Sequence, residues 1–241
     1  MPKQVSGRPL EITREAIEAA ATDPAQISTR VALAKFMAQL FDKVGAMLHL
    51  SGHIVGPDRN SGASPFGHGS DETVAISLLL RIASQLISAS TDLFSDGRAY
   101  AAAALIRQMV EIEYLAWAFE TRNREAERWL RSNKGERQEF FTPAKLRKAA
   151  GGRFRSKDYG YHCELGGHPV PTSAILLDDQ LFVAQMLLSD SLGHAGRIWD
   201  HVVSWARLQN EPFILEQAAE MSSRFADWKS KDALIDLPSP P

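Results

Sequence analysis

Helical periodicity is the feature of this sequence that most limits its fold. In nearly every long segment the apolar residues recur at three- and four-residue spacing, and no run alternates between apolar and polar residues as a half-buried strand does. The pattern predicts an all-α protein, a helical bundle of four long helices with several short ones. Helices are expected near residues 11–22, 26–50, 71–95, 98–121, 123–132, 142–150, 156–166, 175–209 and 213–230.

The length and the connections indicate one domain. A chain of 241 residues that is 44% hydrophobic can bury a large core, and no segment has the composition of a clean interdomain linker. The stretch 52–70 is rich in Gly, Ser and Pro and predicts a mobile loop. The prolines near the C-terminus predict an extended tail over 232–241. We therefore expect a single domain over 1–241.

The cysteine count and the N-terminal residues predict a cytoplasmic protein. Cys163 is the only cysteine, so no internal disulfide can form, and the first residues lack the layout of a signal peptide. The longest apolar tract, Ala99–Phe119, is interrupted by Arg107, Glu111 and Glu113, which are costly to place in lipid. No transmembrane span is expected.

Positive charge is concentrated in one segment, although the net charge of the chain is only −2. Residues 122–157 carry twelve Lys and Arg against four Glu, a local net charge of +8. Aromatic residues lie between these cations: Trp129, Phe140, Phe141 and Phe154. Such a segment predicts a surface that holds RNA or another polyanion, and the alternative is an ordinary solvated connector.

The segment 175–209 predicts a helix with two distinct faces. Its main core stripe is Leu177, Leu181, Ala184, Leu188, Leu192, Ala195, Trp199 and Val202. Asp190, His194, Arg197 and His201 lie on the other side, within about 60° of one another at 100° per residue. Because apolar residues flank this polar column, we expect it to face another helix, a cleft or a second subunit.

The helix over 98–121 also carries a polar face, on which Arg107 and Glu111 stand four residues apart and can pair. The face comprises Tyr100, Ala103, Ala104, Arg107, Glu111 and Tyr114. The pair has two interpretations. It can be a structural ion pair between helices, or the small alanines beside it can leave room for a ligand.

The stretch YHCELGGHPVP, residues 161–171, lies where the glycines and prolines predict the end of a helix, so capping alone can explain His168. His162, His168, His194 and His201 nevertheless fall within 40 residues, which favours a shared site. Three chemistries remain open. A metal could use Glu164, His168, Asp190 and His194, but the Glu-x-x-His pairs of di-iron bundles are absent, so neither metal nor cofactor is expected. A Cys163 nucleophile would need a histidine from elsewhere.

The third chemistry is metal-free RNA cleavage, in which a histidine moves protons and an arginine steadies the phosphate. Arg155-SKDYGY-His162 resembles the nuclease motif of the HEPN superfamily, all-α bundles in which four to six residues separate an arginine from the histidine that follows it. The resemblance implies catalytic roles for Arg155 and His162 without a metal. It also implies a homodimer and a setting in bacterial stress or phage defence.

A second similarity covers more of the chain. The order LIRQMVEIEYLAWAF, a basic connector and YHCELGGHP is similar to an uncharacterised bacterial helical family, with Gly166 where that family tends to have serine. The similarity implies that Arg107, Glu111 and His168 converge in one cleft. An alternative function is therefore a non-catalytic module that binds a small anionic ligand or a protein partner there. The ligand-binding candidates are Arg107, Glu111, Tyr114, Tyr161, His168, His194, Arg197 and His201.

Overall fold

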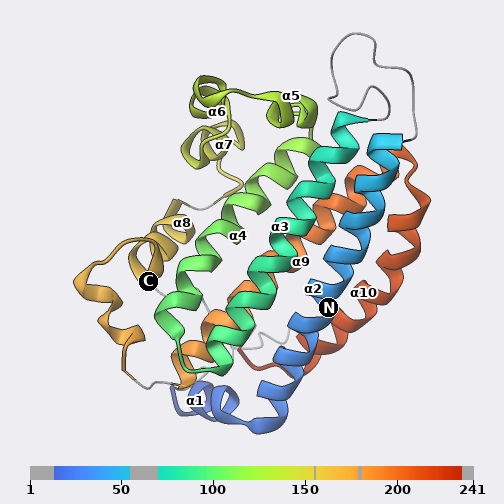
Figure 1. The fold of residues 1–241 in the computed structure, drawn as a ribbon. Coiled ribbons are helices and arrows are strands. Elements are labelled where there is room, and N and C mark those ends of the chain that lie inside the picture. The colour runs from blue at the N-terminus through green and yellow to red at the C-terminus, as the bar shows by residue number, and fades with distance from the viewer. Residues whose placement is uncertain (1–13, 55–69, 155, 179–180, 235–241) are drawn as a thin grey trace, which may run out of the picture.

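The computed structural model describes residues 14–54, 70–154, 156–178 and 181–234, and over these ranges the chain forms an all-α bundle without strands (Figure 1). The α-helices are α1 (Arg14–Thr22), α2 (Pro24–Ile54), α3 (Asp71–Ser95), α4 (Ala99–Glu120), α5 (Ala126–Arg131), α6 (Lys134–Phe140), α7 (Pro143–Ala149), α8 (Ser156–His162), α9 (Leu181–Gln209) and α10 (Pro212–Lys231). A π-helical turn, η1 (Cys163–Gly167), and a 3-10 turn, η2 (Pro171–Leu176), lie between α8 and α9. The all-α prediction is confirmed. Most of the expected loop over 52–70 lies outside the described residues.

The long helices follow their predicted ranges closely, with one clear exception. The helix expected over 175–209 begins only at Leu181, because Pro171 opens a separate 3-10 turn before it. Leu177 and Leu181, two residues of the expected core stripe, are exposed. A short helix, α6, was not predicted; Asn133 and Glu136 form a capping box at its start.

Helices α4 and α9 are parallel neighbours in the bundle. Glu113 meets His194 and Glu120 meets His201, and the two contacts advance along both helices in the same direction. The chain leaves α4 at the end of the bundle that carries α5, α6 and α7, and it descends through α8, η1 and η2 to the start of α9 (Figure 1). Parallel neighbours need such a crossover because the chain must return to the opposite end of the bundle.

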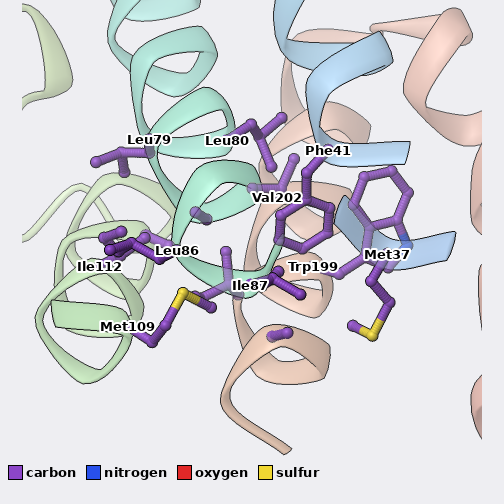
Figure 2. Close-up of a cluster of buried hydrophobic side chains, with 14 of the residues drawn as sticks. Met37, Phe41, Leu79, Leu80, Leu86, Ile87, Met109, Ile112, Trp199 and Val202 are labelled. Atoms are coloured by element: carbon purple, nitrogen blue, oxygen red, sulfur yellow. The ribbon is translucent and has the colours of Figure 1, made fainter. Parts of the chain in front are cut away.

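The core lies between α2, α3, α4 and α9 (Figure 2). Phe41 of α2 stacks on Trp199 of α9 with ring centroids 5.7 Å apart. Gly45 brings α2 close to α3, since a Cβ at this residue would lie 2.6 Å from the Cγ of Arg81. This apolar centre stabilises the framework that holds the polar groups at the α4–α9 contact.

Asp232, which we expected to begin an extended tail, is instead packed into the bundle. Its carboxylate accepts two hydrogen bonds from Arg30 of α2, at 2.6 and 2.7 Å, and both side chains are almost completely buried. The indole of Trp228 donates to the same carboxylate over 2.7 Å. Leu234 is buried beside α1, and the residues after it lie outside the described part of the chain.

Helix α3 is long and apolar enough to cross a membrane by length and composition, and 67% of its most apolar window is buried inside the bundle. A buried core helix produces the same pattern.

Candidate histidine–carboxylate site

Five polar side chains from three helices meet beside the α4–α9 contact: Glu113, His162, Asp190, His194 and Arg197, which together we term the histidine cluster. Nδ1 of His194 lies 2.7 Å from Oε2 of Glu113. Nε of Arg197 donates to Oε1 of the same carboxylate over 2.9 Å. Glu113 is thereby fixed from two sides, and the ring of His194 is held with its Nε2 pointing away from α4.

His162, at the C-terminal end of α8, faces that nitrogen. Its Nε2 lies 3.3 Å from Nε2 of His194 and 3.1 Å from Oδ2 of Asp190. Oδ1 of Asp190 lies 3.7 Å from Nε2 of His194. The two imidazole nitrogens and the Asp190 carboxylate therefore converge on one point, although His162 comes from a different part of the chain.

The histidine cluster has a buried part and a partly exposed part, and we term the exposed part its rim. His162 is 3% exposed and His194 4%, and Glu113 is buried as well. By contrast, the side chains of Asp190 and Arg197 are 39% and 49% exposed. The side chains of Asp190 and Arg197 are therefore the parts of the cluster that solvent reaches.

The electrostatics keep both carboxylates ionised. Burial raises the pKa of Glu113, but the hydrogen bond and charge of His194 together with Arg197 outweigh burial and hold this pKa below its usual value. Burial likewise acts to raise the pKa of Asp190, yet His194 and His162 lower it to about 2. The cluster therefore contains two permanent negative charges near neutral pH.

The turn η1 explains how α8 comes close enough to deliver His162. A Cβ on Gly166 would lie 2.4 Å from the backbone nitrogen of Ala104 and 2.5 Å from the carbonyl carbon of Ala103. No other residue type fits this distance, and the small alanines at the start of α4 allow the approach from the other side. Gly166 therefore seats the turn that follows His162 directly on α4.

A second glutamate–histidine pair lies one heptad further along the same two helices. Nδ1 of His201 forms a short hydrogen bond with Oε2 of Glu120, just as His194 does with Glu113. His201 is buried, but no second imidazole or aspartate reaches it within the described residues. The pair therefore ties α4 to α9 without assembling a cluster.

The face of α4 that carries Arg107 and Glu111 forms a separate, partly exposed group. Nε of Arg107 lies 3.9 Å from Oε1 of Glu111, and the hydroxyl of Tyr159 donates to the same oxygen over 3.0 Å. Gly167 packs against the Arg107 side chain, whereas the neighbouring His168 is exposed and forms no hydrogen bond or ion pair with the described residues.

Three candidate residues from the sequence remain: Tyr114, Tyr161 and Arg155. Tyr114 is buried against Phe154, with ring centroids 4.2 Å apart, and therefore lies within the packing of the bundle. Tyr161 stands beside the cluster, where burial and the charge of Asp190 raise its pKa to about 12. Arg155 lies outside the described residues, so its expected partnership with His162 stays a prediction.

Sequence periodicity grouped Asp190, His194 and Arg197 on one helical face, and the structure brings these three together. It did not single out Glu113, which stands on the apolar side of α4. The signal was present, because a carboxylate among core positions must find a buried partner, and the histidine column of α9 offers one.

His162, Asp190 and His194 are the residues that could hold a metal ion. One ligand atom from each lies within 4.8 Å of the other two, and this set differs from the one considered from the sequence, since it includes His162 in place of Glu164 and His168. Comparison with known protein families, curated proteins and solved structures finds no match to this chain.

Proposed function

We propose that the protein binds RNA along the crossover from α5 to α8 and cleaves it by hydrolysis at the histidine cluster. One observation carries the proposal: the short helix α8 connects the cation-rich crossover to the imidazoles and carboxylates of the histidine cluster. The resemblance to the HEPN superfamily, with its homodimer and its defence setting, belongs to this proposal.

The crossover carries Lys and Arg side chains that form no ion pair with the described residues. Some arginines have structural partners: Arg128 stacks on Phe140 at 3.9 Å, and Arg131 pairs with Asp71. Others are exposed and form no ion pair with the described residues: Arg122, Lys134, Lys145, Lys148 and Arg153. Unpaired surface cations of this kind bind phosphates and release counterions from the nucleic acid.

Helix α8 connects this surface to the cluster. The guanidinium of Arg147 in α7 lies over the ring of Tyr159 at 4.7 Å, and His162 follows Tyr159 by one turn of α8. At the rim, Arg197 remains half-exposed while it bonds Glu113. Its guanidinium can donate to a phosphate oxygen that approaches from solvent, which would place the phosphorus near His162, His194 and Asp190.

The reaction is the addition of water across one P–O ester bond. The water oxygen forms a new bond to phosphorus, the ester oxygen departs with its bonding electrons, and the proton lost by the water is transferred to the departing oxygen. Arg197 stabilises the negative charge that builds up on the phosphate oxygens during this step. The imidazoles and Asp190 create the local field in which the water loses its proton.

Binding and cleavage of a fluorescent single-stranded RNA test the proposal together. Affinity should fall steeply with salt, and changing both Lys145 and Lys148 to alanine should reduce the slope of log K against log salt by about 1.4, since each phosphate contact contributes roughly 0.7. Alanine replacement of Lys35, an exposed lysine of α2, is the matched control and should leave the slope unchanged.

For cleavage, His194→Ala should abolish activity, whereas His201→Ala, which removes an equally buried and glutamate-paired histidine, should retain it. RNA binding that is absent at low salt would refute the binding half of the proposal. Binding without cleavage would refute the catalytic half. That result would favour the alternative, a module that binds an anionic ligand near Arg107, Glu111 and His168.

A further inference from the structure

The geometry points to a site for one divalent transition-metal ion, bound by Nε2 of His162, Nε2 of His194 and the carboxylate of Asp190. We term these three residues the three-ligand site. The existence of this site does not depend on the RNA proposal. The catalytic role of the ion rests on the proposed hydrolysis of RNA, and it replaces the metal-free chemistry that the HEPN resemblance implies.

The distances between the three ligand atoms match a metal polyhedron. The two imidazole nitrogens are 3.3 Å apart, and the oxygens of Asp190 lie 3.1 Å from one nitrogen and 3.7 Å from the other. A tetrahedral ion with bonds of about 2.0–2.1 Å separates its ligand atoms by roughly 3.3–3.4 Å. The separations of His162 Nε2 from His194 Nε2 and from Oδ2 of Asp190 are therefore close to those that a tetrahedral ion imposes.

Glu113 prepares His194 for this role. An imidazole has one proton to share between two nitrogens, and the carboxylate at 2.7 Å draws that proton to Nδ1, leaving the lone pair of Nε2 directed at His162 and Asp190. A carboxylate on the outer nitrogen of a metal-bound histidine is the usual supporting contact in metal sites. Nη2 of Arg197 also lies 2.7 Å from Nδ1, while Nε of Arg197 donates to Oε1 of Glu113 over 2.9 Å and anchors the supporting carboxylate.

The charge of the cluster favours a cation. Arg197 balances Glu113, whereas the ion-pair partners of Asp190 among the described residues are the two imidazoles. The carboxylate of Asp190 therefore has no cationic side chain of its own as an ion-pair partner among the described residues, apart from the imidazoles that would become its fellow ligands. A carboxylate beside buried imidazoles is stabilised by coordination to a metal ion.

The ligand types select the ion. Two imidazoles with one carboxylate suit zinc and its neighbours in the first transition row, whereas Mg²⁺ and Ca²⁺ prefer oxygen ligands. Three protein ligands leave at least one position open, and the exposed side of Asp190 gives solvent access to it. In the proposed hydrolysis the ion would bind the attacking water and lower the pKa of that water. The proton that the water releases would later reach the departing ester oxygen.

Cobalt titration tests the site directly. Tag-free protein, stripped with a chelator that is then removed, should bind one equivalent of Co²⁺ with visible d–d absorption bands, and Zn²⁺ should displace it. His162→Ala and Asp190→Asn should each abolish the bands. Glu113→Gln should weaken binding by about 10–100-fold, the usual effect of removing an outer-shell partner.

The second glutamate–histidine pair supplies matched controls. His201→Ala and Glu120→Gln alter an equivalent pair on the same helices and should leave the Co²⁺ spectrum and affinity unchanged. The proposal is overturned if the wild type binds no Co²⁺, or if binding survives in both His162→Ala and Asp190→Asn. Should His162→Ala fail to fold by circular dichroism, Asp190→Asn decides, since its partly exposed side chain is replaced by one of the same size.

The metal site and the proposed RNA cleavage can be refuted separately. Co²⁺ binding without cleavage would overturn the proposed function and support the three-ligand site. Cleavage that persists undiminished in a chelator would overturn the role of the ion.

Discussion

Gly166 offers the sharpest test of how the chain delivers His162 to the cluster. A methyl group at this residue would stand 2.4 Å from the Ala104 nitrogen and 2.5 Å from the Ala103 carbonyl carbon, about 1 Å inside ordinary contact. Both obstacles are backbone atoms of α4, which cannot rotate aside. The Gly166→Ala variant must therefore lift η1 away from α4, and His162 moves with it.

The expected cost follows from this overlap. Overpacking of a well-packed contact destabilises a protein by about 1–3 kcal/mol, and for a chain of this length each kcal/mol lowers the melting temperature by roughly 2–4 °C. Urea unfolding should report that loss. Because η1 follows His162 directly, the same variant should also weaken Co²⁺ binding at the three-ligand site by more than its stability loss explains.

Gly160→Ala is the matched control, because Gly160 lies in α8, two residues before His162. No atom lies within 4 Å of a Cβ at Gly160, so alanine there should be neutral or stabilise α8 by about 0.5–1 kcal/mol. If Gly166→Ala unfolds at the same urea concentration as wild type and retains its Co²⁺ spectrum, η1 is not seated on α4 and the reasoning fails.

Two further predictions concern buried charge. Asp232→Asn leaves the buried guanidinium of Arg30 without its counter-ion and should lower the free energy of unfolding by about 3–5 kcal/mol. Asp227→Asn, which breaks the exposed pair with Lys231, is the control and should cost less than about 1 kcal/mol. Equal losses of the two variants in urea denaturation would refute this prediction. Because the pKa of Asp190 is lowered to about 2, its ionised form stabilises the metal-free protein above its unfolded pKa, and this contribution is lost as the pH falls toward 2. Acid unfolding of Asp190→Asn should therefore show a weaker dependence on pH over that range than wild type.

Periodicity was enough to predict the long helices, because each buries an apolar stripe that repeats along the chain. The helix over 71–95 begins and ends where the pattern indicates. The same reasoning fails for short elements, whose ends depend on single contacts. The capping box of Asn133 and Glu136 sets α6, and Pro171 separates η2 from α9. Leu177 continues the spacing of α9 but lies before the helix begins, and it is exposed.

The candidate site was predictable only in part, for a related reason. Asp190, His194 and Arg197 share a face because they lie on one helix, and helical geometry is local. Their partners are distant in sequence: Glu113 is 81 residues before His194, and His162 is 32 residues before it. Those contacts depend on the return path of the crossover, which the spacing of apolar residues does not encode.

The two glutamate–histidine pairs show what distinguishes a structural contact from a candidate site in this fold. Glu113 with His194 and Glu120 with His201 repeat at seven residues on parallel helices, so the α4–α9 framework presents both histidines in the same way. Only the first pair lies where α8 ends and η1 is seated against α4. A third element thus adds His162 at that level of the bundle, and the exposed rim of Asp190 opens there. The position of the candidate site is therefore set by where the crossover rejoins the bundle, and the close contact of Gly166 with α4 lies at that point.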